Sequence, residues 1–119
     1  IEELRRNGQL LQHHLAGHPE LMIQQEIGKS SWFGFSLVIR PGSSMTRETL
    51  MRRLEALGFE YRPIVSGNFA RKEVVSHFDH SIFGELRNAD HIDANGLFIG
   101  NHHYPIDEAI EALKTVGAN

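Results

Sequence analysis

The sequence predicts an α+β domain in which a small, mostly antiparallel sheet is covered by helices on one face, and three observations support this fold class. Apolar residues recur at helical spacing in several segments, the first of which has Leu4, Leu11 and Leu15 on one face. Large apolar residues alternate with small ones over residues 33–39, as in a half-buried strand. The elements follow the order helix, strand, strand, helix, strand, loop, helix, strand, helix.

The first part of the chain is expected to form one helix and two strands. Residues 2–15 begin with two glutamates and carry two histidines, His13 and His14, near their end, a charge order that the helix dipole favours. Gly17 and Pro19 end this helix. An irregular strand is expected over residues 20–27 and a regular one over 32–39. The large apolar face of the second strand comprises Phe33, Phe35, Leu37 and Ile39. The side chains on its opposite face are small, which leaves room for another group to approach the strand closely.

Turn and capping residues divide the rest of the chain. Thr46 is a suitable N-cap, and Gly58 is a suitable residue to follow a helix. Pro105 suits the start of the final helix. The expected elements are a helix over 46–57, a strand over 59–62, a loop with short helical turns over 64–88, a helix over 88–95, a strand over 97–99 and a helix over 105–116.

Composition excludes several classes of function. The 119 residues fit one domain, and the net charge of −3 with mixed signs lacks the basic stripe of a nucleic-acid-binding protein. No apolar run approaches the roughly 20 residues of a membrane helix. The absence of cysteine excludes disulfides and thiolate metal sites and is compatible with the cytoplasm, where we expect the protein. Because the chain starts at Ile1 inside an expected helix, we expect it to be a piece of a longer protein.

Two charged residues of the strand over 59–62 form the main candidate site. Side chains alternate across a sheet, so Phe59 and Tyr61 share the core face while Glu60 and Arg62 share the other. On composition alone, a solvated face with a weak ion pair is the more common outcome. The alternative is a binding site in which Arg62 offers its planar guanidinium to a carboxylate or phosphate.

Polar turns provide further candidates. Residues 66–68, Ser-Gly-Asn, can present backbone N–H groups and an amide to an anion or a sugar hydroxyl. His77 and His80 have a spacing that can chelate a metal, but two further ligands are not evident, and we predict no metal site. His102 lies between a strand and a helix, a common place for binding residues, although a plain polar turn is the favoured interpretation.

Three strings carry a more specific signal. They are SWFGF at residues 31–35, LGFEYRPIVSGNF at 57–69, and NADHID at 88–93 followed by FIGNH at 98–102. Together and in this order, they closely resemble the C-terminal domain of the DegT-type sugar aminotransferase and dehydratase family, nearest its 3-dehydratase branch. The resemblance covers about residues 1–116.

The resemblance implies the aspartate aminotransferase fold (fold type I) and a homodimer with sites at the subunit interface. It also implies that a large N-terminal domain, outside this chain, holds pyridoxal phosphate (PLP). Residues 1–119 are then a single C-terminal small domain that helps to close the active site and carries no catalytic residue of its own. By the same match Arg62 is the substrate-contacting arginine. The other implied substrate-binding residues are Glu60, Ser66, Asn68 and His102.

The implied partners are a nucleotide-linked 4-keto-6-deoxy sugar and glutamate as amino donor. The implied chemistry is carbanion stabilisation by the cofactor, followed in the dehydratases by loss of the 3-hydroxyl.

Three interpretations stay open: a 3-dehydratase of deoxysugar and lipopolysaccharide O-antigen synthesis, an aminotransferase of the same family, and a non-catalytic binding or dimerisation module. In the family the first two differ at the cofactor position of the large domain, which is His in the 3-dehydratases and Lys in the aminotransferases.

Overall fold

A computed structural model describes residues 1–64 and 68–116 of the chain. It confirms the α+β class and the expected order of elements. The helices are α1 (Glu2–Leu15), α2 (Arg47–Ala56), α3 (Arg87–Asn95) and α4 (Asp107–Ala112). The strands are β1 (Leu21–Ile23), β2 (Gly34–Ile39), β3 (Tyr61–Arg62) and β4 (Gly96–Gly100). Short 3-10 helices lie at η1 (Phe69–Arg71), η2 (Glu73–His77) and η3 (Leu113–Thr115).

The four strands form one sheet in the order β1-β2-β4-β3, and every neighbouring pair is antiparallel. The long pair at the centre joins β2 to β4, with Gly34 opposite Gly100 and Val38 opposite Gly96. Strand β3 lies at the edge, where Tyr61 pairs with Ile99 and Arg62 with Phe98. Residues far apart in the sequence therefore meet at the β3–β4 edge.

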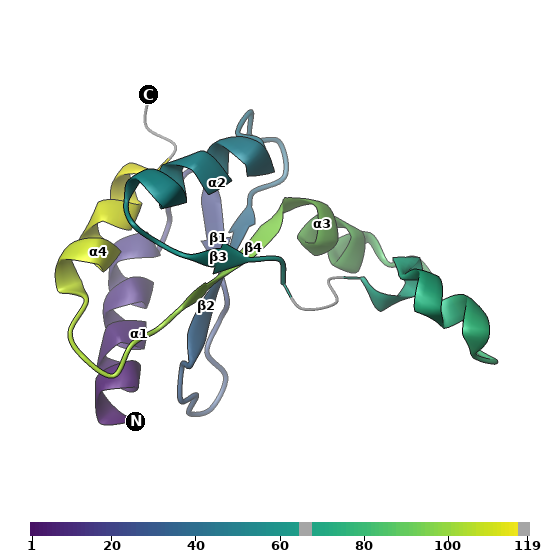
Figure 1. Cartoon of the computed structure of the whole chain (residues 1–119), viewed down its shortest axis with the longest axis horizontal. Coiled ribbons are helices and arrows are strands. Elements are labelled where there is room, and N and C mark those ends of the chain that lie inside the picture. The colour runs from purple at the N-terminus through teal and green to yellow at the C-terminus, as the bar shows by residue number, and fades with distance from the viewer. Residues whose placement is uncertain (65–67, 117–119) are drawn as a thin grey trace.

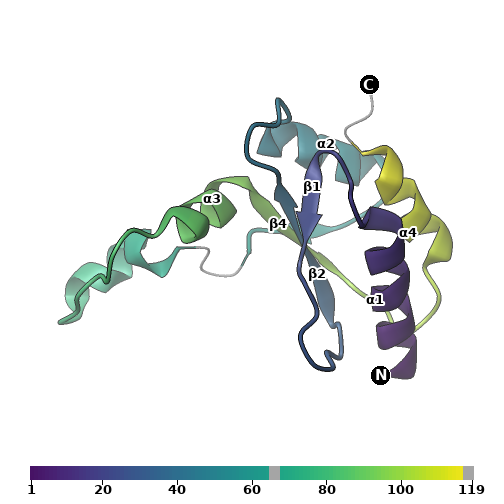
Figure 2. The same cartoon turned by 180° about the vertical axis from the view of Figure 1, so that it is seen from behind.

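Helices α1, α2 and α4 lie on one face of this sheet, with α1 and α4 side by side (Figures 1 and 2). Alternate residues of β2 and β4 point toward these helices, and the helices return leucines and isoleucines at helical spacing. The core that results is built mainly from apolar side chains. Its buried members are Leu11, Leu15, Leu21, Trp32, Phe35, Leu37, Ile39, Leu50, Leu54, Leu97, Ile99, Ile110, Leu113 and Val116.

Local signals act as expected around α2. The hydroxyl of Thr46 accepts a hydrogen bond from the Thr49 N–H and so caps the first turn of the helix. After the helix, Gly58 takes a φ of +84°, a conformation that strongly favours glycine. The chain then enters β3, and this turn determines which side chains the edge strand presents.

Phe33 corrects the expected pattern of the second strand. The expectation placed Phe33 on the core face, but its side chain is 74% exposed. The reason is Trp32, which has a φ of +55° and interrupts the alternation before β2 begins at Gly34. The indole of Trp32 is buried and donates to Glu26 Oε2 at 2.9 Å, while the Phe33 ring contacts the Phe98 ring on the other face of the sheet.

Two strands are also shorter than expected. Strand β1 ends at Ile23 rather than near residue 27, because the side chain of Gln24 takes over the pairing and accepts the Ser36 N–H at 2.6 Å. Strand β3 pairs only through Tyr61 and Arg62, although Phe59 still packs against the core.

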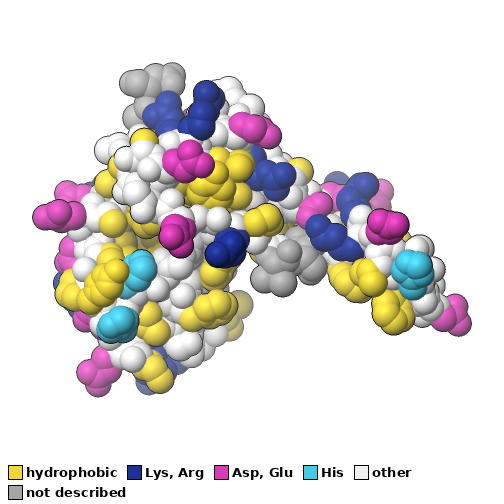
Figure 3. All heavy atoms as spheres, in the orientation of Figure 1, with side chains coloured by type: hydrophobic (Ala, Val, Ile, Leu, Met, Phe, Trp, Pro, Cys, Tyr) yellow, Lys and Arg dark blue, Asp and Glu magenta, His cyan; other side chains and the backbone are white. Residues whose placement is uncertain are grey.

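Residues 68–86, which we call the arm, project away from the sheet and its helices (Figure 1). The base of the arm is attached to α3: Asn68 Nδ2 donates to Asp90 Oδ1 at 2.6 Å, and Arg71 forms an ion pair with the same carboxylate. Hydrophobic side chains cover part of the arm's surface (Figure 3). None of the helices in the described ranges is both long enough and apolar enough to span a membrane.

Candidate substrate-binding pocket

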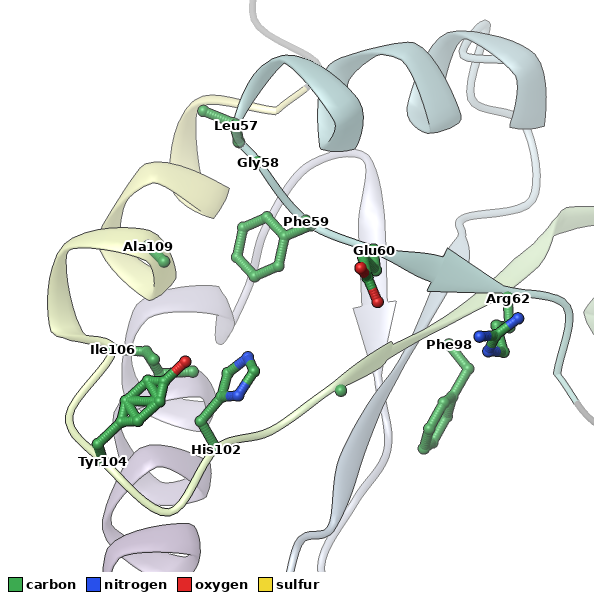
Figure 4. A pocket seen from close by; sticks show the side chains of 11 residues that line it. Leu57, Gly58, Phe59, Glu60, Arg62, Phe98, His102, Tyr104, Ile106 and Ala109 are labelled. Carbon is green, nitrogen blue, oxygen red and sulfur yellow. The ribbon is translucent and has the colours of Figure 1, made fainter.

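A pocket with a volume of about 480 Å³ lies where β3, the end of β4 and the start of α4 meet (Figure 4). One side is aromatic and aliphatic, and the other carries the two charged residues of the edge strand. The lining residues are Leu57, Gly58, Phe59, Glu60, Arg62, Phe98, Gly100, His102, Tyr104, Ile106 and Ala109.

Strand β3 explains why Glu60 and Arg62 face this pocket. Tyr61 packs against the core, and its hydroxyl donates a hydrogen bond to Glu55, which raises the pKa of the phenol. Because successive side chains of a strand point to opposite faces, the residues on either side of Tyr61 point away from the core. The structure thus confirms the expected division of this strand, with both charged residues exposed on the pocket side.

The charged groups of Glu60 and Arg62 do not contribute polar contacts to the fold. Neither makes a hydrogen bond or an ion pair with another residue in the described parts of the chain. An arginine without a partner beside a pocket can bind a carboxylate or phosphate in bidentate geometry. An unpaired carboxylate can accept hydrogen bonds from sugar hydroxyls or an amine. The pair therefore suits a ligand that places an anionic group at Arg62 and hydroxyl or amine donors at Glu60.

The opposite wall is formed by the loop after β4. The rings of His102 and Tyr104 are stacked, with centroids 4.8 Å apart and planes inclined by 22°. Ile106 and Phe59 complete this wall, and Glu60 lies between it and Arg62 in Figure 4. Flat aromatic walls of this kind suit the faces of sugar or base rings and keep water away from a bound polar group.

The structure brings together three of the five residues expected to contact substrate: Glu60, Arg62 and His102. Asn68 lies elsewhere, at the base of the arm. It is 4% exposed, its Oδ1 accepts the Ala70 N–H at 3.1 Å, and its amide nitrogen donates to Asp90. Its role in binding stays a prediction. Ser66 lies outside the described residues.

Sequence reasoning missed three aromatic members of the pocket, Phe59, Phe98 and Tyr104. For Phe98 a signal was present, because Leu97 and Ile99 occupy the core face and alternation places the residue between them on the other face. Tyr104 follows a strand in a loop of unknown course, and only the folded loop places its ring against His102. Metal chemistry has no support in the described ranges, where no cluster of three or more His, Asp or Glu side chains could hold an ion.

The fold and pocket define a small α+β domain whose sheet edge presents an arginine and a carboxylate that have no partner in the described parts of the chain. No family model matches the chain. Curated relatives do, and two of them are GDP-4-keto-6-deoxy-D-mannose 3-dehydratases. The protein from Yersinia pseudotuberculosis is 46% identical over 117 residues, and the one from Escherichia coli O55:H7 is 41% identical over 117 residues. Each match covers 98% of this chain and 30% of the relative.

Solved structures agree with the sequence comparison. A crystal structure of GDP-4-keto-6-deoxymannose-3-dehydratase with a trapped PLP-glutamate geminal diamine superposes with a TM-score of 0.90 at 40% identity. The superposition covers 97% of this chain and 30% of that one. The resemblance inferred from the sequence strings is therefore confirmed: the chain is a homologue of the C-terminal part of these PLP-dependent dehydratases and spans about 30% of their length.

The pocket fits a position beside PLP better than it fits the cofactor itself. Its lining includes one guanidinium but none of the three lysines of the chain. The guanidinium of Arg62 has no partner in the described parts of the chain, and its geometry suits a carboxylate or a phosphate. This donor set is consistent with a domain that faces substrate while another domain holds the cofactor.

Proposed function

We propose that this chain is the C-terminal small domain of a PLP-dependent nucleotide-4-keto-6-deoxyhexose 3-dehydratase that acts on a GDP-linked sugar, with glutamate as amino donor, in deoxysugar synthesis for lipopolysaccharide O-antigen. The observation that carries this proposal is 46% identity to such a dehydratase across 98% of the chain. The pocket supports it, because the free charges of Glu60 and Arg62 suit a ligand with hydroxyl and anionic groups.

The proposed roles of the chain follow from the pocket. When bound in the complete enzyme, PLP supplies the electron sink for loss of a proton and then of the 3-hydroxyl of the sugar. Arg62 binds the glutamate carboxylate or orients the sugar nucleotide. Glu60 accepts hydrogen bonds from the sugar, and the stacked rings of His102 and Tyr104 exclude water from it. These residues bind and orient, and the bond-breaking groups belong to the rest of the enzyme.

The remainder of the enzyme is part of the proposal. Since the chain spans 30% of the relatives, we place the PLP-binding large domain outside it and treat residues 1–119 as one small domain. We also place the enzyme in the cytoplasm, since a cysteine-free chain suits a reducing compartment.

A homodimer is the proposed assembly. The arm exposes several large apolar side chains around a hollow of about 560 Å³, and such patches on soluble proteins commonly mark protein interfaces. We assign this surface to contacts within the dimeric enzyme. The exposed members are Phe69, Val74, Phe78, Ile82 and Phe83.

The test uses the full-length protein that contains this chain, incubated with PLP, glutamate and GDP-4-keto-6-deoxymannose. A dehydratase releases 2-oxoglutarate and ammonia and yields a sugar nucleotide that lacks one oxygen atom, which mass spectrometry identifies. An aminotransferase instead yields a sugar nucleotide with an amine in place of the ketone. Absence of any product and of 2-oxoglutarate would leave the binding or dimerisation module as the correct interpretation.

A further inference from the structure

Two asparagines outside the pocket hold the loop that forms its aromatic wall. Asn7 of α1 is fully buried, and its side-chain nitrogen lies 3.1 Å from Asn101 Oδ1, 3.1 Å from the His102 carbonyl oxygen and 3.0 Å from the Tyr104 carbonyl oxygen. Two N–H groups thus serve three oxygens, and one of them is shared. A single amide therefore fixes the backbone at both residues whose rings stack in the pocket.

Asn101 extends this network to two other parts of the fold. Its Nδ2 donates to the Leu4 carbonyl at 2.8 Å and to the Trp32 carbonyl at 2.7 Å, while its Oδ1 accepts the His102 N–H at 2.8 Å. The loop after β4 is thereby tied to α1 and to the segment before β2. Trp32 is itself buried and has a φ of +55°, so Asn101 connects the loop to a residue of the hydrophobic core.

The arrangement at Asn7 lowers stability in one respect, which indicates that stability alone does not explain it. Asn7 Oδ1 is buried and makes no hydrogen bond with any of the described residues. A buried polar atom without a partner is unfavourable, and an apolar side chain of similar size would avoid it. The amide nitrogen nevertheless makes the contacts that an apolar residue cannot make, and all of them go to Asn101 and the pocket loop.

We propose that Asn7 and Asn101 are positioning residues that set the place of the His102 and Tyr104 rings in the pocket and thereby the affinity for the sugar nucleotide. The inference rests on the proposed function, because it concerns the same pocket. Neither asparagine lines the pocket, so each acts through the loop backbone.

The test measures kcat and KM for GDP-4-keto-6-deoxymannose in the full-length holoenzyme. Asn7→Leu removes the donor, and also the unpaired oxygen, while it keeps the branched shape and number of heavy atoms of the side chain, so the protein should melt at a similar temperature. Its KM should rise about tenfold with little change in kcat, within the hundredfold that a displacement of ~1 Å can cost. Leu15→Ala, on the same buried face of α1 but about two turns further along the helix, should lower the melting temperature and leave KM unchanged.

A double-mutant cycle shows whether Asn7 acts through the two rings. In a background that carries His102→Ala and Tyr104→Ala, the further change Asn7→Leu should alter KM less than twofold, a rough bound set by near-complete coupling. An equal effect in both backgrounds, or an unchanged KM in the folded single variant, overturns the proposal. If Asn7→Leu does not fold, Asn101→Ala at the half-buried end of the network gives the same comparison. Failure of the unmodified enzyme to convert the sugar contradicts the proposed function instead.

Discussion

The ring of Phe98 lies directly against Gly34 on the face of the sheet away from the helices. A Cβ placed on Gly34 would come within 2.5 Å of Phe98 Cε1 and 2.9 Å of the Ile99 carbonyl oxygen. The small face expected for the second strand is therefore occupied, and the group that approaches it is an aromatic side chain from the neighbouring strand. Phe98 also lines the pocket, and its backbone pairs with Arg62. The absence of a side chain at Gly34 therefore affects the position of a residue that shapes the pocket.

Gly34→Ala should therefore disturb the pocket through Phe98. The new methyl group has to displace the ring, and overpacking of this kind typically costs about 1–3 kcal/mol of unfolding free energy. We expect a lower denaturant midpoint and a raised KM for the sugar nucleotide. The double variant Gly34→Ala with Phe98→Leu should recover part of the stability, because the smaller side chain can move aside while the contact with the Ile99 carbonyl oxygen stays. A Gly34→Ala protein as stable as the unmodified one would show that the sheet relaxes without moving Phe98.

Arg62 should contribute to substrate affinity and not to folding. Its side chain has no partner in the described parts of the chain, so Arg62→Ala should leave the melting temperature unchanged. Hydrogen bonds to charged groups are worth about 1.5–3 kcal/mol, so the affinity for glutamate or the sugar nucleotide should fall roughly 10- to 100-fold. Arg62→Lys should restore only part of it, since lysine lacks the bidentate fork.

Arg52 provides the matched control for this measurement. It is an exposed arginine of α2 outside the pocket, where it donates to the Thr49 hydroxyl at 3.3 Å. Arg52→Ala removes the same charge and should not alter substrate affinity. Equal losses in both variants would mean that only the net charge of the domain attracts the substrate, and an unchanged affinity in Arg62→Ala would remove Arg62 from the proposed site.

Much of this fold follows from periodicity and capping. Thr46 and Gly58 delimit α2 as expected, and the alternation around Tyr61 correctly placed Glu60 and Arg62 on the face away from the core. These are local effects, in which side-chain direction and backbone preference depend on a few neighbouring residues. The face of a strand and the ends of a helix are for this reason accessible from the sequence.

Other parts depend on contacts between distant residues. Nothing near Trp32 in the sequence indicates its positive φ, which is supported by hydrogen bonds from its indole to Glu26 and from Asn101 to its carbonyl. The stacked wall of the pocket likewise requires Asn7, 95 residues before His102, to hold the loop. The arm is a third case, because several of its large apolar side chains are exposed in the described part of the chain, and neighbouring residues in the sequence do not indicate this.

The exposed apolar residues of the arm should control the oligomeric state. Phe83 is 97% exposed, so Phe83→Asp should not affect folding of the small domain, but a carboxylate at an apolar interface is strongly unfavourable. We expect light scattering to show that the full-length enzyme changes from dimer to monomer, or that the dissociation constant of its dimer rises. Ile27→Asp places the same charge on another highly exposed apolar residue, away from the arm, and should leave the dimer intact. Equal dissociation in both variants would mean that the arm does not form the dimer interface.

Attachment of the arm to α3 should depend on the charge of Asp90. The Arg71 guanidinium, and after it the Asn68 amide, hold the pKa of this carboxyl below its usual range. A carboxyl with a lowered pKa in the folded state stabilises that state above its unfolded pKa of about 4, and this contribution disappears as the pH falls through the lowered folded value. The arm base should therefore be most protected at neutral pH and loosen in acid.

Hydrogen exchange at the Ala70 N–H, which donates to Asn68 Oδ1, reports this attachment directly. Asp90→Asn should lower the protection factor of this amide at neutral pH, whereas at low pH the variant and the unmodified protein should have similar values once intrinsic exchange rates are corrected. Asp79→Asn is the matched control, because Asp79 lies on the exposed arm outside this network. Equal protection in the Asp90→Asn protein at neutral pH would mean that the hydrogen bonds of Asn68 hold the arm without the carboxylate charge. In that case the orientation of the arm would be insensitive to pH, and its exposed aromatic residues would be presented in the same way under all conditions in which the domain is folded.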